Sequence, residues 1–200
     1  MIPPPREVLA TKACDSSGEP LVVYHGTCRT FTTFSSEYLL SVGTHFGCLE
    51  QANYRIGFYD IQYFGAKTQY TCDMQGCRII PAYLTIKKLI DLRGHDFGWE
   101  RPAATAYLLT QSGLISAEEA SACTGLKETD TLPTAWWIET TPDQMKNQNA
   151  ALTDILSAKG FDGILYANTN EPRDKKQRDA YLVFRPQQIY SALTGQCVGE

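Results

Sequence analysis

No apolar run in this 200-residue sequence approaches the roughly 18 residues that a membrane-spanning helix needs. The N-terminal segment, with prolines at 3–5, also lacks the basic and then apolar pattern of a secretory signal peptide. These absences argue against a membrane protein. They predict a protein that stays in the cytosol, or one that enters a target cell by an export route that needs no signal peptide.

Positive charge is scarce as well. The chain has 18 Lys and Arg residues against 22 Asp and Glu residues, which gives a net charge of −4 with neutral histidines. Proteins whose main partner is a nucleic acid usually carry a basic surface. We therefore do not expect nucleic acid to be the main partner of this chain.

The seven cysteines do not form a metal-binding pattern. No Cys-x-x-Cys pair occurs, and Cys72 and Cys77 lack the second pair or nearby histidine that would complete a zinc site. We therefore expect no metal. The cysteines are expected to be free thiols in a reducing cytosol.

The composition, 43% apolar and 20% charged, fits a single globular domain over residues 1–200. Apolar and alternating segments predict strands at 21–25, 43–47, 78–87, 162–167 and 180–185. One helix is expected to begin at Glu50, one after a capping box formed by Ser116 and Glu119, and one to end at Gly160. Short strands with few helices predict an α+β fold.

A short motif at the end of the first predicted strand carries most of the functional information. The apolar segment 21–24 is followed by His25, Gly26 and Thr27. A histidine at a strand end offers two ring nitrogens to a ligand. Because Gly26 has no Cβ, a flat ring could lie close to its backbone N–H and C=O. The alternative is that His25 is a core residue bonded to a backbone carbonyl.

Four further motifs follow in order at 43–47, 81–87, 160–166 and 179–191. With 24–27, they resemble the ADP-ribosyltransferase superfamily of the diphtheria-toxin and poly(ADP-ribose) polymerase type, in its His-Tyr-x branch. The likeness is closest to small transferase-like domains of bacterial effectors and phage-borne polyproteins. It implies a split β-sandwich with few helices and with NAD in a cleft between two small sheets.

The resemblance covers residues 20–99 and 151–193. It leaves 100–150 unmatched, and we interpret this segment as an insert that would provide a target-recognition surface. Within the matched part, His25 would bind a hydroxyl of the adenosine ribose and act in catalysis. Gly26 would hold the nicotinamide amide through its backbone, with Thr27 supporting the turn.

The resemblance also implies aromatic rings that stack on nicotinamide. The polymerases place a tyrosine two residues after the glycine of the second strand, and here His45 stands in that slot, followed by Phe46. A second tyrosine is matched by Tyr54 if a gap of two residues is allowed. Stacking needs only flat rings, so His45 or Phe46 would serve with Tyr54. The alternative is that Phe46 and Tyr54 are core residues.

The acidic position is where the chain departs from the polymerases. Those enzymes carry a catalytic glutamate directly before a Tyr-Ile-Val-Tyr segment, and the matching residue here is Ala180. Asp179 and Glu171 are the acids that would replace it, unless both are surface charges. Neighbouring strand residues point to opposite faces, so Asp179 would need a bulge or loop to reach the site.

The predicted function is therefore a mono-ADP-ribosyltransferase that uses NAD to modify a protein acceptor, in the role of a bacterial effector or toxin. Growth of an ADP-ribose polymer is not expected without the glutamate. Two alternatives stay open. One is an NAD glycohydrolase, in which water is the acceptor. The other is a module that binds NAD or ADP-ribose with little catalysis, which Ala180 favours.

Overall fold

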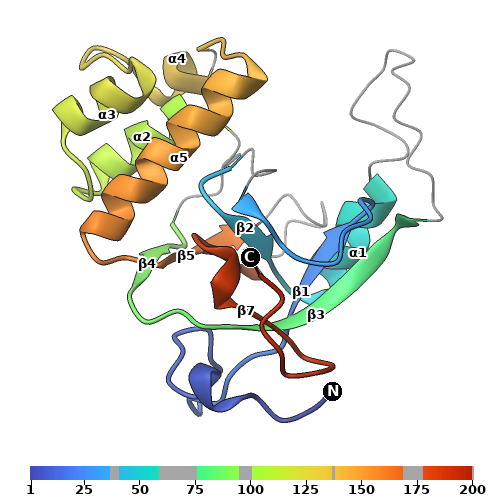
Figure 1. Ribbon diagram of the computed structural model, residues 1–200. Coiled ribbons are helices and arrows are strands. Elements are labelled where there is room, and N and C mark those ends of the chain that lie inside the picture. Colours follow the sequence, from blue (N-terminus) through green and yellow to red (C-terminus); the bar gives the residue numbers. More distant parts are fainter. Residues whose placement is uncertain (37–40, 59–75, 95–100, 137, 169–177, 200) are drawn as a thin grey trace.

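The structure, a computed structural model, describes residues 1–36, 41–58, 76–94, 101–136, 138–168 and 178–199 (Figure 1). The strands are β1 (Val23–Thr27), β2 (Thr44–Phe46), β3 (Arg78–Leu84), β4 (Leu89–Leu92), β5 (Gly163–Asn168), β6 (Arg178–Val183) and β7 (Ile189–Ser191). The α-helices are α1 (Leu49–Phe58), α2 (Pro102–Gln111), α3 (Ala117–Thr124), α4 (Leu132–Trp136) and α5 (Pro142–Ala158). Short 3-10 helices are η1 (Arg6–Val8) and η4 (Pro186–Gln188).

Two small sheets form the framework. The three-stranded sheet has the order β1-β3-β7, and the four-stranded sheet has the order β2-β6-β5-β4. Neighbouring strands run antiparallel, apart from the parallel pair β4 and β5. The expected α+β architecture with two small sheets is confirmed.

Strand β6 shows how the four-stranded sheet divides the core in two. Side chains alternate between the faces of a strand. Ala180 and Leu182 pack in a cluster with residues of α2 and α5, whereas Tyr181 and Val183 pack in a second cluster with Val23 of the other sheet. The molecule therefore has a helical layer over one face of this sheet, and the three-stranded sheet near its other face (Figure 1).

The segment 100–150 is part of this core. Helix α2 is buried over most of its surface, with Ala104, Ala106 and Leu109 at 0% exposed. Helix α3 begins with the expected capping box, because Ser116 Oγ accepts a bond from the Glu119 N–H and a Glu119 carboxylate oxygen accepts one from the Ser116 N–H. The helices of 100–150 thus cover the sheet, and their role as a target-recognition surface stays a prediction.

One cysteine pair differs from expectation. Cys28 and Cys77 form a disulfide across 49 positions of sequence. The register of β1 and β3 explains this pairing, because Thr27 lies opposite Arg78 and the next residues outward are the two cysteines. The spacing of the cysteines in the sequence does not reveal that register. Four others are free thiols, Cys14, Cys48, Cys123 and Cys197, and Cys72 lies outside the described residues.

Two further observations concern only the part of the chain that the structure describes. Within it, no three His, Cys, Asp or Glu side chains gather as they would around a metal ion. None of its helices is both long and apolar enough to cross a membrane.

Candidate functional site

The candidate site lies where strands β1 and β2 separate. Tyr24 and Gly47 exchange two backbone hydrogen bonds, of 2.8 and 3.0 Å. In a continuing antiparallel ladder the next such pair would be Gly26 with His45. Instead, the His45 carbonyl accepts a bond of 2.8 Å from Nδ1 of His25. The ladder therefore ends here, and an edge of β1 opens.

Gly26 presents its backbone to this open edge. Successive strand residues direct their N–H and C=O to opposite sides, so those of Gly26 point the same way as those of Tyr24, away from β3. The pairing with β3 is consistent with this direction, because Tyr24 lies opposite Pro81, which has no N–H to donate to it. A donor and an acceptor thus lie side by side at the opening.

Helix α1 closes one side of Gly26. A Cβ built on Gly26 would lie 2.2 Å from the carbonyl oxygen of Ala52 in α1. Only glycine permits this approach of the helix to the strand. Tyr54, which is half-buried, and Arg55 lie in α1 directly after Ala52, so this approach also brings them near the strand.

The ring of His25 is held by aromatic neighbours and by one hydrogen bond. Its centroid lies 5.3 Å from that of Phe34, 5.6 Å from that of Phe46 and 6.5 Å from that of Phe31. Burial lowers the pKa of His25, and the nearby charges of Arg55 and Arg78 lower it further. The ring is therefore neutral at pH 7. Because a carbonyl can only accept, Nδ1 carries the proton and Nε2 is an acceptor.

This geometry combines both sequence-based interpretations of His25. The bond to a backbone carbonyl is the one expected of a core histidine, and it uses Nδ1 alone. Among the described residues, Nε2 has no hydrogen-bond partner. The bond to His45 thus fixes the ring while leaving one acceptor for a ligand.

His45 is held at both ring nitrogens. Ser41 Oγ lies 2.9 Å from Nε2, and the Tyr166 hydroxyl lies 3.0 Å from Nδ1. Burial, followed by the charges of Arg55 and His25, lowers the pKa of His45 to about 3. The ring is a neutral, anchored group. Sequence reasoning missed Ser41 and Tyr166, although Tyr166 ends one of the motifs quoted above.

Phe46 and Thr27 have structural contacts. Phe46 is 2% exposed and packs between the sheets beneath His25 and Phe34. It therefore supports the His25 ring and has no exposed face on which nicotinamide could stack. Thr27 ends β1, and its hydroxyl accepts a bond of 3.1 Å from the Arg29 N–H. This bond orders the turn after the strand.

The acidic residues follow the predicted alternation of β6. Ala180 is 2% exposed and faces the helical layer. Asp179 points to the other face, with its side chain 46% exposed and one carboxylate oxygen 3.7 Å from Arg93. The structure therefore puts Asp179 on the same face of the sheet as Tyr181. Glu171 lies outside the described residues.

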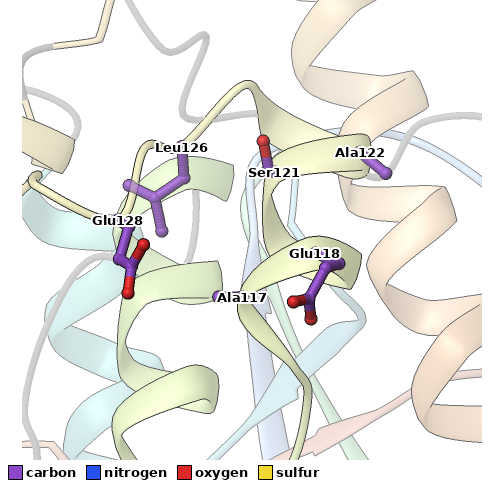
Figure 2. A pocket seen from close by; sticks show the side chains of 6 residues that line it. All are labelled: Ala117, Glu118, Ser121, Ala122, Leu126 and Glu128. Atoms are coloured by element: carbon purple, nitrogen blue, oxygen red, sulfur yellow. The ribbon is translucent and has the colours of Figure 1, made fainter.

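A shallow hollow occurs elsewhere, in the helical layer. It lies between α3 and the segment after it and is lined by Ala117, Glu118, Ser121, Ala122, Leu126 and Glu128 (Figure 2). None of these residues belongs to the opening between β1 and β2. The chemistry of the candidate site therefore rests on the strands and not on this hollow.

Comparison with known proteins identifies the family. A family model described as ADP-ribosyltransferase in polyvalent proteins matches residues 15–197. The chain belongs to this family. The matched span of this ADP-ribosyltransferase domain contains β1, β2, α1 and β6, and it runs through the segment 100–150. No curated protein and no solved structure matches the domain significantly.

The buried histidines predict that the transferase domain loses stability in acid. An unfolded histidine has a pKa near 6.5, whereas that of His45 in the folded domain is about 3. As the pH falls below 6.5, the unfolded chain binds a proton that the folded domain excludes. Between pH 7 and pH 5, His45 alone should lower the free energy of unfolding by about 2 kcal/mol. The lowered pKa of His25 acts in the same direction.

Urea denaturation at pH 7, 6 and 5 measures this loss. His45→Gln, which cannot titrate, should show a weaker dependence on pH than the unmodified domain. Equal slopes for the two proteins would mean that His45 titrates in the folded domain as it does in the unfolded chain.

Proposed function

We propose that this domain transfers a single ADP-ribose unit from NAD to a protein acceptor, as an effector or toxin would. The observation that carries the proposal is the open edge of β1, where the backbone of Gly26 lies beside the fixed, neutral ring of His25. The family supports ADP-ribosyl transfer in general. The geometry of the edge supports NAD as the donor.

Three features of NAD match groups at this edge. The carboxamide of nicotinamide has an N–H donor and a carbonyl acceptor, which complement the C=O and N–H of Gly26. A ribose hydroxyl can donate to Nε2 of His25. The diphosphate carries negative charge, and Arg55 and Arg78 are both near enough to His25 to lower its pKa. Tyr54, on the helix that packs over Gly26, is the candidate for stacking on nicotinamide.

The reaction breaks the bond between the nicotinamide nitrogen and C1 of the ribose. The electron pair leaves with nicotinamide, and positive charge develops at C1 as in glycoside hydrolysis. The acceptor then bonds to C1 and releases its proton. The domain's contribution would be to hold nicotinamide and ribose in place while the bond breaks. A second transfer onto the first ribose needs an acid or base at the ribose hydroxyl, and Ala180 supplies none.

His25→Ala should weaken NAD binding at least tenfold, which corresponds to about 1.4 kcal/mol, because the variant removes the acceptor Nε2. Titration calorimetry with NAD measures the affinity, and circular dichroism checks that the variant is folded. His25→Gln, which keeps a polar side chain in the same place, should lose less. Unchanged affinity in a folded His25→Ala protein would refute the proposed site.

A second measurement separates transfer from the alternatives. The domain is incubated with biotinylated NAD and cell lysate, and both free nicotinamide and labelled proteins are measured. A transferase releases nicotinamide and labels a protein, a glycohydrolase releases nicotinamide alone, and a binding module does neither. Asp179→Ala, assayed in the same way, tests whether that exposed carboxylate supports the charge at C1.

A further inference from the structure

The hydrogen bond between His45 and Tyr166 passes over a strand. His45 is on β2 and Tyr166 is on β5, and β6 lies between these two strands in the sheet. Neighbouring strands are about 4.8 Å apart, so β2 and β5 are roughly 10 Å apart. The two side chains therefore meet above β6, on the face that the helical layer covers.

Ala180 provides the space for this bond. On this face β6 presents Ala180, which is the register partner of Tyr166, and Leu182, which is the register partner of His45. Paired residues of an antiparallel sheet place their side chains next to each other on one face. The Tyr166 ring can lean across β6 toward His45 because its neighbour on that strand is a methyl group.

The bond belongs to a chain of contacts that ends at His25. Tyr166 meets the His45 ring edge-on, with the ring planes at 90° and the centroids 6.0 Å apart. Together with Ser41, it occupies both nitrogens of that ring. The backbone carbonyl of His45 in turn holds Nδ1 of His25. His45 thus connects β5 with the open edge of β1. Its side chain contacts the Tyr166 hydroxyl, and its carbonyl binds His25.

We propose that Tyr166 is a positioning residue of the site: its hydroxyl, reaching across Ala180, fixes the orientation of the His45 ring, and through His45 it fixes the orientation of His25. The link to catalysis rests on the proposed function. The link to the two rings does not, because it follows from contacts within the protein. The two parts therefore have separate tests.

Tyr166→Phe is the direct test, since it removes one hydroxyl and keeps the ring. Tyr83→Phe is a matched control. Tyr83 is 5% exposed against 4% for Tyr166, and its hydroxyl donates a hydrogen bond to the carbonyl of Ile2, in a remote part of the fold. The chain has three histidines, so ¹⁵N-detected NMR can follow each ring. Nicotinamide release from NAD gives the activity.

In Tyr166→Phe, we expect the signals of both the His45 ring and the His25 ring to shift. Nicotinamide release should fall at least fivefold relative to Tyr83→Phe. If Tyr166→Phe unfolds the domain, Ser41→Ala removes the bond at the other nitrogen and should also shift the signals of the two rings. Unchanged ring signals in the folded variant would overturn the link from Tyr166 to the two rings. Nicotinamide release equal to that of Tyr83→Phe would overturn its link to catalysis. If the unmodified domain neither binds nor cleaves NAD, the proposed function fails, and the ring signals still decide whether Tyr166 positions His45.

Discussion

Ala180→Glu should lower the free energy of unfolding by about 3 kcal/mol or more at pH 7. Ala180 is 2% exposed and packs with Leu182 on the face that α2 and α5 cover. A carboxylate there would be buried among the apolar side chains of that cluster, which costs several kcal/mol. It would also fill the space through which Tyr166 reaches His45. Urea denaturation measures the loss.

The same variant tests the departure from the polymerases. It puts a glutamate where those enzymes carry their catalytic acid, and we still expect no ADP-ribose polymer, because the carboxylate would enter a packed core. Lowering the pH should reduce the destabilisation, since protonation neutralises the buried group. Asp179→Ala is the matched control one residue away. Its side chain is 46% exposed, so its stability should change by no more than about 0.5 kcal/mol. A high-molecular-weight ladder formed by Ala180→Glu, or a stability equal to that of the control, would contradict this account.

Patterns within short stretches of sequence predicted several strands and helix ends correctly. Alternation in 78–87 and 180–185 predicted β3 and β6, and the opposite faces of Asp179 and Ala180 followed from the same alternation. The capping box at Ser116 predicted the start of α3. Gly160 follows α5 with a φ of 84°, as its position after the apolar stripe of that helix implied. Each signal depends on residues within a few positions of one another.

Two of the elements that sequence reasoning missed, α2 and β4, have ambiguous patterns. Helix α2 is apolar on nearly all sides and buried on nearly all sides, so it lacks the stripe that identifies a surface helix. Strand β4 has only four residues and pairs in parallel with β5, whose partner residues lie far along the chain. A segment this short carries too few residues to show a period.

The site was predicted only in part because its contacts are non-local. The motif at 24–27 identified His25 and Gly26, but the bond from His25 to His45 depends on how two strands separate. Phe46 was a candidate for stacking with a core role as the alternative, and the pairing of β2 with β6 places it in the core. The contact between His45 and Tyr166 joins residues 121 positions apart, and no local pattern records it.

Gly26→Ala should have the largest effect on the site itself. The added Cβ would lie 2.2 Å from the carbonyl oxygen of Ala52 and 3.1 Å from its Cα, and both of these are backbone atoms of α1. A backbone cannot rotate away as a long side chain can, so the whole helix must move outward. We expect a loss of about 3 kcal/mol in the free energy of unfolding, at the upper end for overpacking. NAD affinity should fall at least tenfold, because α1 carries Tyr54 and Arg55.

Two controls isolate this cause. Gly94→Ala adds the same methyl group at a glycine that has nothing within 4 Å of a new Cβ, and it should change stability by no more than about 0.5 kcal/mol. Ala52→Gly combined with Gly26→Ala should not restore stability, because the blocking atoms belong to the backbone of residue 52 and remain after its side chain is removed. Recovery in the double variant would mean that side chains, and not the approach of helix to strand, require glycine at position 26. Wild-type stability of Gly26→Ala alone would show that α1 does not lie against the open edge of β1. In that case Tyr54, which α1 carries, would not border the proposed NAD site.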